Sequence, residues 1–156
     1  AGAPRHRPVN AMTDLTTHPV HHLVRYFERL SPADLPRLAE FYAADARFKD
    51  PFNEVQGLPA IEAVFAHMFR ALDAPRFVIT GQIVQGPQAM LTWDFNFGFK
   101  GQMGTQTVRG ATHLQFNAAG LVSLHRDYWD AAEELDEKLP LLGALMRWLK
   151  RRVQAR

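Results

Sequence analysis

The sequence predicts an α+β domain in which helices pack on one face of a curved antiparallel sheet. Two observations predict this class. Apolar residues recur at helical spacing in the first half of the chain, whereas from Phe77 onward they alternate at the two-residue period of strands. Helical segments followed by a run of strands are typical of α+β domains.

The first half of the chain predicts three helices and one short strand. Ser31 followed by Pro32 is typical of an N-cap with proline at the first helical position, and Gly57-Leu58-Pro59 precedes another helical pattern. The short strand stops at Pro51. We expect the helices at residues 19–30, 31–42 and 60–72, and the strand at residues 46–50.

The second half predicts four strands separated by Gly, Pro and Asn, at residues 77–84, 89–99, 106–116 and 121–129. Residues 131–156 again have a helical pattern, which Pro140 interrupts. The apolar face from Leu141 to Val153 is too large to stay in water, so we expect this helix to fold back onto the protein.

Length and composition limit the possible classes. The 156 residues suit one domain, and 18 Lys and Arg against 16 Asp and Glu give a net charge of +2, too small to indicate nucleic-acid binding. No apolar run approaches the roughly 18 residues of a membrane span. We expect residues 1–11, which lack an apolar signal core, to be a cloning remnant or a disordered arm, and residues 12–156 to form a single cytoplasmic domain.

The absence of cysteine excludes disulfides, thiolate metal sites and a cysteine nucleophile. Histidine is more frequent, but His21 and His22 are adjacent and so point to different sides of a helix. His67, His113 and His125 belong to separate elements, and no pair shows the spacing of a metal motif. We expect neither a metal ion nor another cofactor.

The order of these elements, ending in Arg126-Asp127-Tyr128-Trp129-Asp130, resembles the nuclear-transport-factor-2-like superfamily. The resemblance covers residues 19–130 and implies the superfamily's cone-shaped fold, a cystatin-like roll around one pocket. The ending Tyr-Trp-Asp is similar to the last strand of SnoaL-like polyketide cyclases and of limonene epoxide hydrolase. Because members often pair through the outer face of the sheet, the resemblance also implies a homodimer.

Ketosteroid isomerase is the closest chemical comparison. It removes a proton next to a carbonyl with an Asp and stabilises the enolate with a Tyr and a protonated Asp. Asp50 resembles the base, and Tyr26 precedes it by 24 positions, the family's separation. Thr112 stands in the place of the protonated acid and would be a weaker donor.

Limonene epoxide hydrolase gives the second comparison, since its water-activating Asp resembles Asp127. Trp93 and Phe95 stand where that enzyme has its Arg and Asp partners. Without the cationic donor, epoxide hydrolysis is the less favoured activity.

Strand alternation predicts which side chains share the pocket. If Asp127 faces inward, His125 and Trp129 do so too, and the family register turns Asp94 and Asn96 outward. The side chains that we expect to contact a ligand are mostly aromatic: Phe48, Phe65, Phe69, Trp93, Phe95, Phe97, Thr112, Leu114 and Trp129. Such a pocket suits a small, flat, apolar molecule.

Each candidate polar residue also has a structural interpretation. Asp50 could form an Asx-type cap before Pro51. Tyr26 could be a half-buried core residue with a satisfied hydroxyl group. Asp127 could pair with Arg126 on the surface, where such a pair contributes little.

Two functions follow from the sequence. One is a cofactor-independent acid–base enzyme, isomerase- or cyclase-like, acting on a small apolar carbonyl compound. Asp50 or Asp127 would move the proton, His125 would relay it, and Tyr26 and Thr112 would polarise the oxygen. The other is a non-catalytic binding module for an apolar ligand. The helix after Pro140 would be a lid over the pocket, which we favour, or a clasp on the partner subunit.

Overall fold

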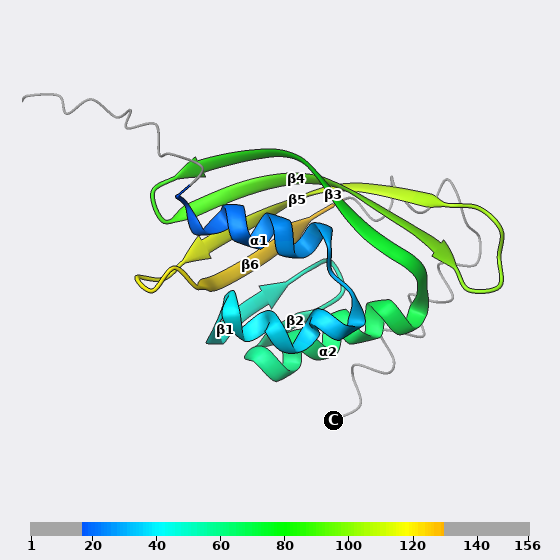
Figure 1. Ribbon diagram of the computed structural model, residues 1–156, viewed down its shortest axis with the longest axis horizontal. Helices are drawn as coiled ribbons and strands as arrows, with labels where there is room; N and C mark the ends of the chain where they lie inside the picture. The colour runs from blue at the N-terminus through cyan, green and yellow to red at the C-terminus, as the bar shows by residue number, and fades with distance from the viewer. Residues whose placement is uncertain (1–16, 130–156) are drawn as a thin grey trace, which may run out of the picture.

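The computed structural model describes residues 17–129 as three helices on one side of a six-stranded mixed sheet, with strand order β2-β1-β6-β5-β4-β3 (Figure 1). The helices are α1 (Pro19–Glu28), the 3₁₀-helix η1 (Pro32–Glu40) and α2 (Leu58–Ala71). The strands are β1 (Tyr42–Lys49), β2 (Glu54–Gln56), β3 (Leu72–Gln85), β4 (Gln88–Phe99), β5 (Gln106–Phe116) and β6 (Val122–Tyr128). The predicted helix at residues 131–156, with its role as lid or clasp, lies outside the described residues.

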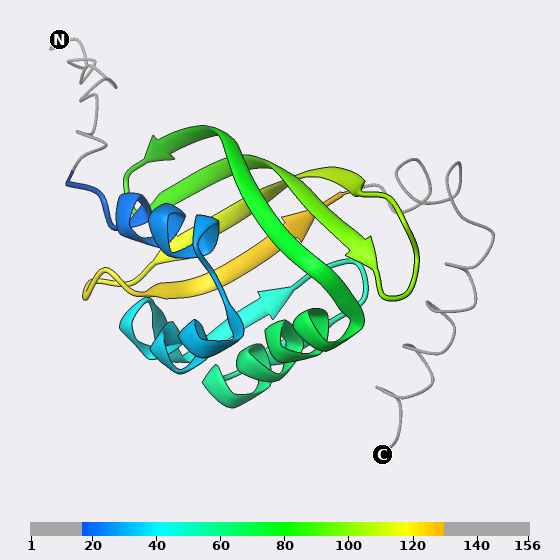
Figure 2. The same ribbon diagram turned by 45° about the vertical axis from the view of Figure 1, so that its right-hand side comes forward.

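Strands β3 to β6 form the predicted antiparallel meander, and β1 joins it through a parallel pairing with β6. The long strands curve over α1, so that the three helices lie inside the bend of the sheet (Figure 2). This arrangement confirms the predicted α+β class and the cone-shaped fold. It also brings side chains from β1, β4, β5 and β6 into one interior.

The second helix differs from the prediction in type and in length. Pro36 lies inside it, and a proline there lacks the N–H group of an α-helical bond and crowds the preceding turn. The segment therefore forms a 3₁₀-helix that ends at Glu40, and Tyr42 begins strand β1 instead of ending a helix.

Strand β2 was not predicted. It has three residues, of which only Val55 is apolar, so it carries no alternating pattern of its own. Its pairing with β1 forms it: Phe48 lies opposite Val55 in an antiparallel hairpin. After this hairpin Gly57 adopts φ 92°, a left-handed conformation that favours glycine, and leads the chain into α2.

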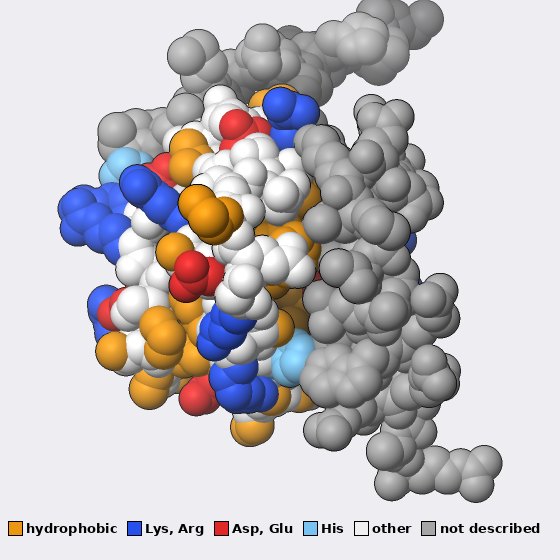
Figure 3. Space-filling model, turned by 90° about the vertical axis from the view of Figure 1, so that its right-hand side faces the viewer, with side chains coloured by type: hydrophobic (Ala, Val, Ile, Leu, Met, Phe, Trp, Pro, Cys, Tyr) orange, Lys and Arg blue, Asp and Glu red, His pale blue; other side chains and the backbone are white. Residues whose placement is uncertain are grey.

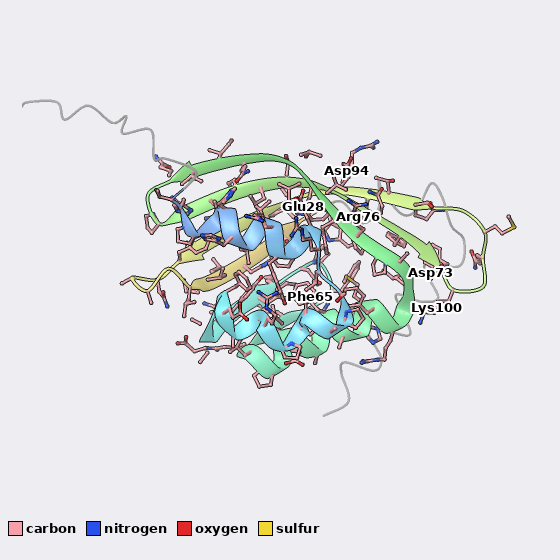
Figure 4. The ribbon with its side chains drawn as sticks, in the orientation of Figure 1. Glu28, Phe65, Asp73, Arg76, Asp94 and Lys100 are labelled. Atoms are coloured by element: carbon pink, nitrogen blue, oxygen red, sulfur yellow. The ribbon has the colours of Figure 1, made fainter. Side chains whose placement is uncertain are left out.

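The helices bury the apolar faces that their sequences predict. Val20, Leu23 and Phe27 of α1 are buried, and so are Ile61 and Phe65 of α2. Figure 4 shows Phe65 on the side of α2 that faces the interior and Glu28 at the end of α1 beside β3. There Glu28 Oε1 accepts a hydrogen bond of 3.3 Å from the backbone N–H of Ile79, which ties α1 to the sheet.

Candidate functional site

A chain of side-chain hydrogen bonds crosses the interior from β1 to β4 through β6 and β5. The Tyr42 hydroxyl lies 2.7 Å from His125 Nδ1, and His125 Nε2 lies 2.9 Å from Asp127 Oδ1. Thr112 Oγ1 donates to the same Asp127 oxygen at 2.5 Å. Trp93 Nε1 donates to Thr112 Oγ1 at 2.8 Å, so five side chains form one continuous network.

The sheet register accounts for the meeting of these side chains. Asp127 and Thr112 are opposite each other across the β5–β6 pair, and His125 is opposite Phe48 across the β1–β6 pair. Residues two apart on a strand share a face, so His125 and Asp127 face inward together, as predicted. Asp127 does not pair with Arg126, whose guanidinium instead lies 4.7 Å from the ring centre of Tyr128.

The protons of the network are fixed by the chemistry of the groups. An ionised Asp127 can only accept, so His125 Nε2 carries the hydrogen and Nδ1 presents its lone pair. The Tyr42 hydroxyl therefore donates to Nδ1. Burial, with a smaller contribution from the Asp127 charge, raises the pKa of Tyr42 well above its ordinary value, so the phenol stays protonated.

The Asp127 carboxylate is held on one side only. Oδ1 accepts from both His125 and Thr112, whereas Oδ2 has no hydrogen-bond partner within residues 17–129. The side chain is 15% exposed, against 5% for that of His125. Asp127 thus combines a fixed orientation with one oxygen that has no hydrogen-bond partner in the described part of the chain.

Asp50 forms a cap of the Asx type, which was the structural interpretation that its sequence position also allowed. Its Oδ1 atom accepts hydrogen bonds from the backbone N–H groups of Phe52, at 2.7 Å, and Asn53. Asn53 Nδ2 also donates to both carboxylate oxygens. These bonds shape the β1–β2 turn, while burial raises the pKa of Asp50 and the Asp127 charge adds to this shift.

Tyr26 lies elsewhere than the isomerase comparison implies, and this expectation is corrected. Its hydroxyl donates to the backbone carbonyl of Asp34 at 2.9 Å, and its ring stacks on Phe41 at 4.4 Å. It lines a hollow formed by residues of α1, η1 and the β5–β6 region. Equal spacing misled because the Tyr26 hydroxyl bonds to the backbone carbonyl of Asp34, although the ring is buried in the core.

Thr112 also departs from its predicted role. It was expected to polarise a substrate oxygen, but its hydroxyl proton is directed to Asp127. Thr112 therefore serves to hold the carboxylate, and neither predicted hydroxyl group is available as an oxyanion donor.

Aromatic rings pack around the network. The ring centres of Phe48 and Phe27 lie 4.8 and 5.8 Å from that of His125, and Phe65 packs on both phenylalanines. Of the other predicted lining residues, Trp93, Phe97 and Leu114 are buried, whereas Phe69, Phe95 and Trp129 are partly buried against the same core.

The sequence profile of the SnoaL-like domain matches residues 23–125, which is more than half of the chain. The chain belongs to the SnoaL-like domain family. No functionally curated protein gives a significant sequence match to this SnoaL-like domain.

Solved structures share the fold of this SnoaL-like domain. A hypothetical protein of Catenulispora acidiphila, with a ketosteroid isomerase-like fold and in complex with trimethylamine, has a TM-score of 0.65 at 19% identity over 77% of this chain and 91% of its own. A candidate SnoaL-like polyketide cyclase of Shewanella putrefaciens has a TM-score of 0.64 and 19% sequence identity, and the match covers 77% of this chain and 97% of its own. An LEH-like epoxide hydrolase of M. tuberculosis has a TM-score of 0.62 and 15% sequence identity, and the match covers 83% of this chain and 92% of its own.

Sequence reasoning missed Tyr42 in the site of the SnoaL-like domain. The residue was assigned to the end of a helix, although it is fully buried and binds His125. The alternation of Phe48 and Ala46 does not extend unchanged to Tyr42, because the register of the β1–β6 pair shifts between Tyr42 and Arg47 and Ala44 is exposed. Phe27 was predicted as buried but not as a neighbour of the site, because that contact depends on how α1 crosses the sheet.

The surface of the SnoaL-like domain seen in Figure 3 has Lys and Arg interspersed with Asp, Glu and apolar side chains, without one continuous basic stripe among its described residues. No helix within residues 17–129 is long and apolar enough to cross a membrane. In the same part of the chain, no three His, Asp or Glu side chains come together as a metal site would require.

Proposed function

We propose that this SnoaL-like domain is a cofactor-independent acid–base enzyme that acts on a small apolar carbonyl compound, with Asp127 as the group that transfers the proton. The proposal rests on the unequal hydrogen bonding of the two carboxylate oxygens of Asp127. One oxygen is fixed by His125 and Thr112, and the other has no partner in the described part of the chain. A positioned carboxylate beside aromatic rings is suited to removing a proton from carbon.

The proposed step starts with Asp127 Oδ2 accepting a proton from the carbon next to the substrate carbonyl. The C–H bond breaks, an O–H bond forms, and the electron pair enters the enolate. Reprotonation at another carbon gives an isomer. Attack of the enolate carbon on a second carbonyl of the same molecule instead gives a ring, and the resulting alkoxide takes the proton back from Asp127. His125 and Thr112 keep the carboxylate oriented in both cases.

The donors around Asp127 favour the cyclase-like reaction. The hydroxyl protons of Tyr26 and Thr112 are both committed within the protein, so neither can stabilise an enolate. A substrate with two carbonyl groups flanking the acidic carbon spreads the enolate charge over its own oxygens. We therefore propose a 1,3-dicarbonyl compound that carries a further carbonyl group as the target of ring closure and is apolar and flat enough to lie among the aromatic rings.

Exchange of the acidic proton in heavy water, followed by NMR, tests this proposal without knowledge of the natural product. Simple aryl 1,3-diketones are suitable probes. We expect Asp127→Asn to slow enzyme-dependent exchange by roughly 10²–10⁴. The matched control is Asp94→Asn on β4, since Asp94 has no role in the Asp127 network. Equal exchange by Asp127→Asn and the unaltered protein would remove the enzyme proposal.

A binding module for a small apolar amine is the second candidate. Asp50 and Asp127 are close enough for one charge to raise the pKa of the other carboxyl, and neither forms an ion pair with Lys or Arg in residues 17–129. The trimethylamine complex of the C. acidiphila protein is in keeping with such a ligand. Calorimetric binding of trimethylammonium that depends on Asp127, with no proton exchange, would favour this function over the enzyme.

We also propose that the protein forms a homodimer through the outer face of the sheet. Ile83 is 72% exposed and Tyr128 46% exposed, and both line a shallow hollow together with Met90 and His113. A second copy would cover these apolar side chains. In light scattering we expect a dimer that Ile83→Glu shifts toward the monomer, and a monomer in both proteins would contradict the proposal.

A further inference from the structure

A second hollow, with a volume of about 470 Å³, lies between α1, η1 and the β5–β6 connection. None of its lining residues belongs to the hydrogen-bonded network of Asp127. Tyr26, which the isomerase comparison assigned to the active site, lines this hollow instead. Its size falls within the range of small-molecule sites in proteins.

The charged residues that line the hollow give an excess of positive charge on the side formed by α1. The acidic groups on η1 are already satisfied: Arg37 holds Glu40 through two hydrogen bonds of 2.9 and 3.0 Å, and Ser31 donates twice to Asp34. Arg25 and Arg29 form no ion pair or hydrogen bond within residues 17–129 through their side chains, and both line the hollow. Four residues apart on α1 and its C-cap, they are neighbours on the helix surface.

The other side of the hollow is aromatic. The rings of Tyr26 and Phe41 stack at 4.4 Å, and Phe116 lines the hollow beside them. Because the Tyr26 hydroxyl is bound to the Asp34 carbonyl, its polar end is already satisfied and the ring contributes mainly apolar contact. An apolar surface beside two guanidinium groups that have no partner within residues 17–129 fits a molecule with a flat apolar body and one anionic end.

We infer that this hollow is a second binding site, separate from Asp127, for a small aromatic carboxylate. Arg25 and Arg29 bind the carboxylate, for which the planar guanidinium fork is well suited. The aryl body lies against Tyr26, Phe41 and Phe116. This inference does not depend on the proposed reaction at Asp127.

Binding of 2-naphthoate to the full chain, followed by residue-resolved NMR and by calorimetry, tests the inference. We expect shifts concentrated on residues of α1 and η1. The double variant Arg25→Gln/Arg29→Gln should weaken binding about tenfold or more, because each lost charge-assisted bond contributes more than a neutral one. Both side chains are exposed, so the fold should persist. Arg47→Gln, an exposed arginine of β1 outside the hollow, is the control and should bind as the unaltered protein does.

Two related probes separate the features of the site. Neutral 2-naphthamide should bind much more weakly than naphthoate if the arginines recognise the carboxylate, and inorganic phosphate should bind weakly if the aromatic surface contributes. Phosphate binding as tight as that of naphthoate would reduce the site to a surface that only attracts anions. Shifts centred on the Asp127 network, or equal affinity in the double variant, would overturn the inference.

Discussion

The Nε2 atom of His125 lies 2.9 Å from the Oδ1 atom of Asp127, two residues further along β6. Strand geometry alone puts both side chains on one face, but the pair gains its fixed orientation from other strands. Tyr42 of β1 binds the far nitrogen of the imidazole, and Thr112 of β5 binds the same oxygen of the carboxylate. Removing any one member should therefore disturb the others.

Tyr42→Phe should lower the free energy of unfolding by roughly 1–3 kcal/mol, because it leaves the buried His125 Nδ1 atom without a donor. Urea denaturation measures the change. Tyr128→Phe is the control, since Tyr128 is 46% exposed and makes no side-chain hydrogen bond within residues 17–129. Equal stability of Tyr42→Phe and Tyr128→Phe would show that the Tyr42 hydroxyl is not needed to hold His125.

Gly110→Ala should displace the indole of Trp93. A Cβ atom at Gly110 would lie 2.3 Å from a ring carbon of Trp93, closer than atoms can approach. We expect a loss of roughly 1–3 kcal/mol in stability and a shift of the Trp93 Nε1–H signal in NMR, because the bond to Thr112 is disturbed. Gly98→Ala is the control, since its nearest neighbour would be 3.4 Å away. An unchanged indole signal in Gly110→Ala would contradict this packing.

Asp50→Ala should destabilise the β1–β2 turn by roughly 1–3 kcal/mol, because the N–H groups of Phe52 and Asn53 lose their acceptor. Asp50→Asn keeps an acceptor oxygen and should be much less harmful. Burial raises the pKa of Asp50 in the folded state above its unfolded value of 3.8, so the stability of the unaltered protein falls as pH rises through the folded-state pKa.

The asparagine variant cannot ionise and avoids this fall. Its stability relative to the unaltered protein should therefore be higher at pH 7 than at pH 3.5. Urea denaturation at the two pH values gives the comparison, and a relative stability that decreases toward pH 7 would contradict the raised pKa of Asp50.

Tyr26→Phe should make the protein less sensitive to alkali. Burial, with the Asp34 charge second, raises the pKa of Tyr26 from 10.0 to about 12. Between these two values the unfolded chain ionises at this position while the folded chain does not, so stability falls as pH rises from 10 to 12. The fall should be smaller in Tyr26→Phe than in Tyr128→Phe. Parallel losses of melting temperature in the two variants would show that Tyr26 ionises normally.

The sequence by itself determined the class of fold, because that class depends on patterns within single segments. The helical spacing of Val20, Leu23 and Phe27 marked the buried face of α1, and the alternation through Trp93 and Phe97 marked the inward face of β4. It also placed His125 beside Asp127, since residues two apart on a strand must share a face.

The tertiary structure alone decided how the polar candidates are used, because hydrogen-bond partners come from segments far apart in the chain. Tyr26 was expected to face Asp50, but its hydroxyl donates to the backbone carbonyl of Asp34 in η1. Tyr42 reaches His125, 83 positions away, because β1 pairs with β6. Spacing in a sequence cannot show which strand will lie beside which, or which of several acceptors a hydroxyl group meets first.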